Sequence, residues 1–279
     1  MNSRKARRAF AAVLSCGLAT WGCSGAGAPA QVRVASTTSL YDTGLLDALV
    51  PAFEAAHPDY RLQVVAVGTG EALELGQRRD ADLVIVHAPE REREFLAAGH
   101  GLRRTTFMQN DFVLAGPAAD PAGLAGAADA SAALRRVGEA RADFVSRGDD
   151  SGTHIRERML WREAGIEPSG DWYLEVGQGM GATLLFAGER QAYTLTDQAT
   201  LSVLQRNGNE LVELFAGGPS LKNVYSIIPV AGAPEADGAA ALETWMLGDE
   251  AAAIIRDYGR EEYGRPLFTL TGPDAEAVP

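Results

Sequence analysis

The chain has 279 residues, 46% of them hydrophobic, and its 37 Asp and Glu against 25 Lys and Arg give a formal net charge of −12. This length allows one large or two modest globular domains, and so acidic a chain repels nucleic acid and anionic lipid. Lys5 and Lys222 are the only lysines, which disfavours enzymes that use lysine as a nucleophile or Schiff base.

Residues 1–22 have the layout of an export signal. Four basic residues between positions 4 and 8 precede an apolar stretch over 9–21, which is too short to span a bilayer. We expect cleavage before Cys23, lipidation of Cys23, and a flexible tether over 23–30. The mature protein would then work outside the cytoplasm, held at the membrane only by its lipid.

Other processing routes stay open. Cys16 also fits a lipidation pattern, cleavage after Ala30 would release an unanchored periplasmic protein, and the pair Arg7-Arg8 weakly indicates twin-arginine export. Both cysteines lie in or at the end of the signal, so the mature chain would have no disulfide and no zinc-thiolate site.

From residue 31 onward, short apolar runs alternate with segments of helical period, which predicts an α/β protein with mostly parallel sheets. The continuous apolar runs at 83–86 and 227–230 are typical of strands covered on both faces. Strands are expected at 32–36, 62–67, 83–87, 112–115, 144–146, 172–176, 192–196, 211–215 and 224–230. Helices are expected over 45–53, 155–160, 239–246 and 250–258.

The first strand ends in four hydroxyl residues, Ser36 to Ser39, directly before a helix. The N–H groups at a helix start have no intrahelical acceptor, and the helix dipole is positive there, so the junction is suited to an anion. The alternative is that Ser39 and Asp42 merely form a capping box.

Three later junctions repeat this design. Residues 67–73 contain Gly68-Thr69-Gly70, but Leu73 breaks the dinucleotide-binding pattern. Residues 144–154 place Arg147 before a helix start, and its guanidinium suits an oxyanion. The alternative for Arg147 is a salt bridge to Asp149 or Asp150, and we expect at least one of them to orient it. Glycines also open the helix in 177–184, where close packing on the sheet is the alternative.

Enzyme and metal signatures are weak. Ser151 and His154 suggest a hydrolase, but residues 148–152 do not form a nucleophile elbow. The four histidines have no metal-ligand spacing, and we expect each to be structural or solvated. The chain has no Walker loop. We therefore expect no catalysis, no cofactor and no bound metal cation.

Together these segments resemble the extracellular tungstate-binding proteins of ABC importers, a branch of the type II periplasmic binding proteins. The matching segments are 36–54, 64–76, 81–92, 110–123, 144–154, 160–166, 177–184 and 193–200. The resemblance implies two lobes, each a doubly wound, mostly parallel sheet flanked by helices, with the ligand cleft between them. Lobe one would comprise 31–115 and 224–279, and lobe two 116–223, with strands crossing between them at 112–116 and 224–230.

The resemblance also implies a ligand and its partners. A tetrahedral oxyanion, tungstate or molybdate, would be bound and delivered to the permease and ATPase subunits of the importer by a monomeric binding protein. The first loop of this chain has a shorter Thr-rich run than the family commonly shows, which leaves open which hydroxyl binds and which caps. The implied ligands are Thr37, Thr38, Ser39, Thr69, Gly70, Arg147, Ser151, Gly152 and Thr153.

Residue types alone leave several alternatives. Phosphate or sulfate would also suit such a cleft, and Asp149, Asp150 or Asp197 would accept the hydrogen bond that the hydroxyl of hydrogen phosphate donates. An exported phosphoryl or sulfuryl hydrolase would use Ser151 or Thr38. An interaction protein with no small ligand would be favoured by a closed cleft with Arg147 engaged in a buried salt bridge.

Overall fold

The computed structural model describes residues 28–272 and 275–277. The predicted signal over 1–22, Cys16 and Cys23 lie outside this part of the chain. Within it, no helix is both long and apolar enough to cross a bilayer.

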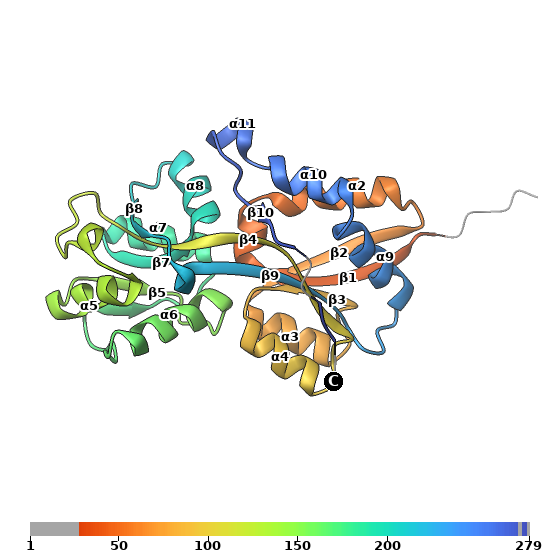
Figure 1. Ribbon diagram of the computed structural model, residues 1–279, viewed down its shortest axis with the longest axis horizontal. Coiled ribbons are helices and arrows are strands. Elements are labelled where there is room, and N and C mark those ends of the chain that lie inside the picture. The colour runs from red at the N-terminus through yellow and green to blue at the C-terminus, as the bar shows by residue number, and fades with distance from the viewer. Residues whose placement is uncertain (1–27, 273–274, 278–279) are drawn as a thin grey trace, which may run out of the picture.

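The first lobe is a mixed sheet covered on both faces (Figure 1). Its strands β2, β1 and β3 are parallel, β9 pairs with β3 antiparallel, and β4 pairs antiparallel with β9. Helices α2, α9 and α10 cover one face, and α3 and α4 cover the other. The bounds are β1 Ala30–Thr37, α2 Leu45–Ala56, β2 Tyr60–Val67, α3 Thr69–Gln77, β3 Leu83–Val86, α4 Pro89–Ala97, β4 Arg103–Gly116, β9 Lys222–Pro229, α9 Ala236–Met246 and α10 Asp249–Asp257.

The second lobe repeats this plan. Strands β6, β5 and β7 are parallel, and β4 runs antiparallel to both β7 and β8. Helices α5 and α6 cover one face, and α7 and α8 cover the other. The bounds are α5 Ala130–Ala140, β5 Phe144–Ser146, α6 Gly152–Glu163, β6 Tyr173–Glu175, α7 Met180–Arg190, β7 Tyr193–Asp197, α8 Gln198–Arg206 and β8 Val212–Ala216.

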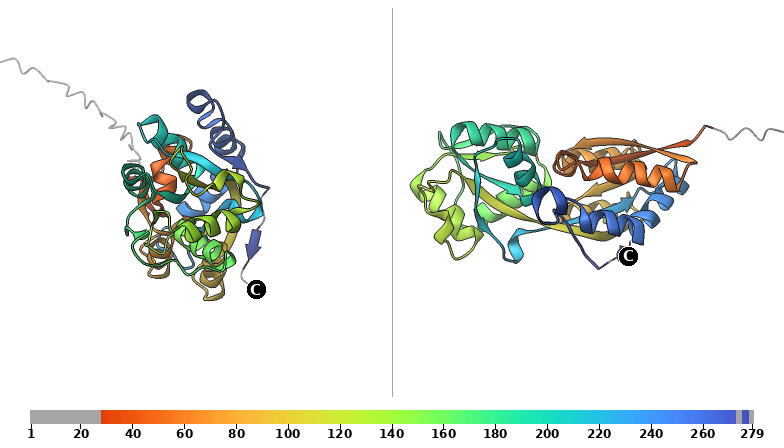
Figure 2. Two further views of the ribbon diagram at one scale, coloured as in Figure 1. Left: turned by 90° about the vertical axis from the view of Figure 1, so that its left-hand side faces the viewer. Right: turned by 90° about the horizontal axis from the view of Figure 1, so that it is seen from above.

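Strand β4 belongs to both sheets. Residues 105–111 pair with β9 in the first lobe, and residues 112–116 pair with β7 and β8 in the second. Leu221, just before β9, packs in the core of the second lobe, so the chain crosses back there. Figure 2 shows the two lobes as successive halves along the longest axis of the molecule.

The predicted strands lie within two residues of the observed ones, except that β4 begins at Arg103 and the prediction began at residue 112. The missed half of β4 is polar: buried Arg104 donates from Nε to Glu92 at 2.6 Å, and a bulge interrupts pairing between Thr106 and Met108. Helices α4, α5 and α8 were not predicted. The short elements that were also missed are α1 Thr38–Asp42, η1 Leu124–Gly126, η2 Pro219–Leu221, α11 Arg260–Tyr263, β10 Thr269–Leu270 and β11 Ala275–Ala277. The doubly wound, two-lobed α/β fold is confirmed, but the sheets are mixed and not mostly parallel, because β4 and β9 run antiparallel to their neighbours.

Candidate anion-binding site

The predicted junctions of the two lobes face each other. A methyl group placed on Gly68, at the start of α3, would lie 3.6 Å from the Asp149 carbonyl oxygen in the second lobe. A methyl group on Gly179, at the start of α7, would lie 3.4 Å from Thr38 Oγ1 in the first. The starts of α1, α3, α6 and α7 therefore converge, and their N–H groups and positive dipole ends meet between the lobes.

Arg147 occupies the centre of this region. Its side chain, 2% exposed, lies at the end of β5 and reaches across to the first lobe. Nη1 donates to Ser39 Oγ and Nη2 to Thr38 Oγ1, both at 3.1 Å. A hydroxyl that accepts from a guanidinium keeps its own proton to donate. Arg147 thus leaves both hydroxyls as donors toward a ligand.

Asp149 orients this arginine, as predicted. Its Oδ2 accepts from Nε of Arg147 at 3.1 Å and also from Nη2, while its Oδ1 accepts from the Ser151 N–H at 3.2 Å. Asp150 instead pairs with Arg91 of α4 at 3.1 Å, across the interlobe seam. The positive charge of Arg147 is therefore partly balanced within its own loop.

Two of the predicted hydroxyls cap helices. Thr37 Oγ1 accepts from the Leu40 N–H at 3.3 Å, and Ser151 Oγ accepts from the His154 N–H at 3.2 Å. The suggested capping box of Ser39 and Asp42 is wrong, because Thr37 is the cap. Asp42 Oδ2 instead accepts from the Gly181 N–H at 3.1 Å in the second lobe, and burial raises the pKa of this carboxyl.

Of the buried hydroxyls that have no partner in the described part of the chain, three lie at these strand and helix ends. They belong to Ser36 at the end of β1, Thr69 at the start of α3 and Thr153 in the first turn of α6, and each of these residues is 0% exposed. An unpaired buried hydroxyl costs about 1–3 kcal/mol. Three such groups at converging strand and helix ends indicate a polar ligand.

Gly152 of the second lobe packs closely against His87 of the first. A methyl group on Gly152 would lie 2.7 Å from His87 Cε1, so only glycine fits there. Burial and the nearby charge of Arg147 lower the pKa of His87 to about 3. The imidazole is therefore neutral at pH 7 and packs on Tyr225, with 4.8 Å between ring centroids. Sequence reasoning expected His87 to be structural or solvated and missed this interlobe position, for which the sequence carries no local signal.

The arrangement does not suit hydrolysis. His154 Nδ1 accepts from the Asp150 N–H at 3.0 Å, and Ser151 Oγ accepts from the His154 N–H, so these side chains are not paired as base and nucleophile. Among the described residues, no group of three or more His, Cys, Asp and Glu could hold a metal ion.

An interaction protein with no small ligand would be favoured by a closed cleft with Arg147 in a buried salt bridge. Arg147 does form a buried ion pair, with Asp149. That alternative leaves the unpaired hydroxyls of Ser36, Thr69 and Thr153 unexplained.

Residues 24–250 match a family model described as a PBP superfamily domain, the periplasmic binding proteins. The chain belongs to this superfamily. It is 43% identical over 277 residues to the tungstate-binding protein TupA of Peptoclostridium acidaminophilum, a match covering 92% of this chain and 95% of the relative. Together with the sheet topology, this confirms the resemblance to tungstate-binding proteins of the type II class.

Similarity to two solved structures supports the same family assignment. The tungstate ABC transporter structure from Geobacter sulfurreducens is 44% identical, with a TM-score of 0.74, over 82% of this chain and 98% of that one. TupA from Desulfovibrio alaskensis G20 is 40% identical, with a TM-score of 0.71, over 87% and 99%. These relatives are named as binding and transport proteins.

Proposed function

We propose that this member of the PBP superfamily captures tungstate between its lobes and delivers it to the permease and ATPase subunits of an ABC importer. The observation that carries the proposal is the bridge from buried Arg147 in the second lobe to the hydroxyls of Thr38 and Ser39 in the first. The names of the relatives support tungstate as the anion.

The proposed ligands divide by role. Thr38, Ser39, Thr69 and Thr153 offer hydroxyl donors, and Arg147 offers its charge. Thr37 and Ser151 already use their side-chain oxygens as caps, so we assign them a supporting role through the backbone, and Gly70 and Gly152 offer N–H groups at helix starts.

A fully deprotonated oxyanion suits such a set, because every oxygen needs donors and none needs an acceptor. Asp149 already accepts from Arg147 and Ser151, which disfavours hydrogen phosphate.

We propose that binding closes the lobes about the crossing strands β4 and β9. The lobes would be residues 31–115 with 224–279, and residues 116–223. Two polar contacts that bridge them support this closure: Arg91 with Asp150, and Asp42 with the Gly181 N–H. We further propose an extracytoplasmic monomer, anchored by lipid at Cys23.

The test is calorimetric titration of the mature domain, stripped of bound anion, with tungstate, molybdate, sulfate and phosphate. We expect tight one-to-one binding of tungstate and weak binding of sulfate and phosphate. A preference for phosphate or sulfate would overturn the substrate and keep the site, whereas no binding of any anion would overturn the function. Turnover of a phosphate or sulfate ester that is lost in Ser151→Ala would support the hydrolase instead.

A further inference from the structure

A groove runs along the outer seam between the lobes, where α4 of the first lobe faces α6 of the second. It consists of two adjoining hollows of about 210 and 200 Å³, which share Glu90 and Arg91 of α4 and Ile155 and Met159 of α6. We call these two hollows the seam groove. His87 and Gly152, in tight contact between the lobes, line its inner side.

The seam groove is rich in arginine although the chain is acidic. Its lining contains five arginines and only three carboxylates, whereas Asp and Glu outnumber Lys and Arg by 37 to 25 in the whole chain. Arg93, Arg158 and Arg162 are exposed, and Arg91 and Arg156 are half-buried. The carboxylates are Glu90, Glu94 and Asp150.

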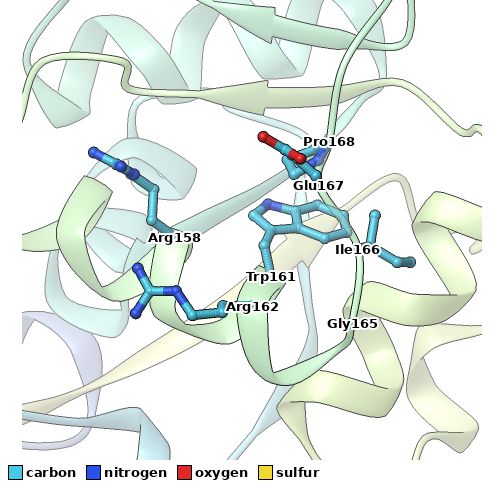
Figure 3. A pocket seen from close by; sticks show the side chains of 7 residues that line it. All are labelled: Arg158, Trp161, Arg162, Gly165, Ile166, Glu167 and Pro168. Atoms are coloured by element: carbon cyan, nitrogen blue, oxygen red, sulfur yellow. The ribbon is translucent and has the colours of Figure 1, made fainter.

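Arg158 and Arg162 are exposed residues of this surface. They are four residues apart on α6, so they lie on one face of the helix, and Figure 3 shows both side chains extending to the same side. Both also line a neighbouring hollow of about 440 Å³ beside Trp161 and Glu167. The two guanidiniums therefore stand where the seam groove meets a second concave surface.

The seam groove also depends on how the lobes are placed. Arg91 belongs to α4, and its partner Asp150 lies in the loop before α6, at 3.1 Å. Opening the lobes would break this pair and separate the two walls of the groove. A partner that contacts both walls at once would therefore recognise the closed, loaded protein.

We infer that the seam groove is a docking surface for an acidic segment of the importer's membrane permease. This inference rests on the proposed function and adds the surface through which delivery begins. A permease is favoured over a lipid surface because Glu90 and Glu94 are interspersed among the arginines and the net charge of −12 repels anionic lipid.

The experiment compares Arg158→Glu/Arg162→Glu with a control of equal charge change, Arg141→Glu/Arg190→Glu. The control residues are exposed and precede β5 and β7, at the sheet edge opposite the anion site. Neither pair belongs to the proposed ligand set. Each purified protein is added to right-side-out membrane vesicles from source cells lacking this gene, and tungstate uptake is measured against protein concentration.

We expect Arg158→Glu/Arg162→Glu to need about tenfold more protein for half-maximal uptake, since like charges placed across an interface are costly. The difference should shrink in high salt, calorimetric tungstate affinity should be unchanged, and the control should behave as wild type.

A half-maximal concentration equal to that of wild type would overturn the inference, as would an equal defect in the control. If Arg158→Glu/Arg162→Glu also loses binding to protein-free vesicles that contain anionic lipid, and to the same extent, the groove would be a membrane-binding surface. That result would overturn the inference as well. Failure of wild-type protein to bind tungstate or to support uptake would instead refute the proposed function.

Discussion

Replacing Arg147 with alanine is the sharpest test of the anion site. Of the five guanidinium N–H groups, four are used in bonds to Ser39, Thr38 and Asp149, which leaves one N–H on Nη1 for a ligand. Arg147→Ala removes that donor and also the bonds that orient the two hydroxyls.

The loss can be estimated from these contacts. A hydrogen bond to a charged group contributes about 1.5–3 kcal/mol. The lost donor and the disordered hydroxyls together amount to about 3–5 kcal/mol, which corresponds to tungstate binding about 10²- to 10⁴-fold weaker. The variant also leaves the Asp149 carboxylate unpaired beside a dianion, which places the effect toward the upper end.

A second variant separates these causes. Arg147→Ala/Asp149→Asn removes the unpaired charge as well, and we expect it to bind at least about tenfold more tightly than Arg147→Ala, because repulsion between like charges is gone. Calorimetry measures both affinities, and circular dichroism with thermal unfolding checks that each variant folds. A folded Arg147→Ala protein with an affinity within about threefold of wild type would refute this description of the site.

Three other substitutions test separate features. Gly152→Ala places a methyl group 2.7 Å from His87 Cε1, so it should oppose closure of the lobes and weaken tungstate binding. The melting temperature of the anion-free protein should not fall. Small-angle scattering that shows normal compaction of the variant with tungstate would contradict this prediction. Thr69→Val removes a buried, unpaired hydroxyl at nearly constant shape and should weaken binding about 10- to 100-fold by calorimetry while stabilising the anion-free protein; unchanged affinity would exclude Thr69 as a ligand. Burial raises the pKa of Glu157 from 4.5 to about 7, so the folded protein binds this proton more tightly than the unfolded chain does. The resulting stabilisation is complete below pH 4.5, and about 3 kcal/mol of the free energy of unfolding is lost as the pH rises to 7. Glu157→Gln keeps an acceptor for Tyr173 and Trp161 and should remove that pH dependence, which denaturant unfolding at pH 5 and pH 8 would measure; equal pH dependence in the variant would refute the assignment.

Local patterns predicted much of the fold. The short buried strand β3 is marked by four consecutive apolar residues, and its predicted bounds match closely. The first half of β4 escaped prediction because its polar residues are stabilised by distant partners, as Arg104 is by Glu92 of α4. The order of apolar and polar residues over 103–111 does not indicate such pairing.

The same limit applies to the site. The residue types at the strand ends predicted where an anion would lie, and the structure brings those strand ends together. Which hydroxyl caps α1 depends on the backbone angles of Thr37, −96° and 148°, and neighbouring residue types do not determine them. The contact of Asp42 with Gly181 joins residues 139 apart in the chain, so sequence reasoning assigned Asp42 to a local cap.

Because β4 is shared, the order in which the chain is completed matters for folding. All the strands of the second lobe lie between residues 112 and 216, whereas the sheet of the first lobe is incomplete until β9 has been added. Asn223 of β9 donates a hydrogen bond to Asn110 of β4, 113 residues earlier in the chain. A chain that has reached residue 216 can finish the second sheet, yet it still exposes the edges of β3 and of the first half of β4. Unpaired edges of this kind invite aggregation. Truncation before residue 222 would therefore yield an association-prone protein in place of a smaller stable one.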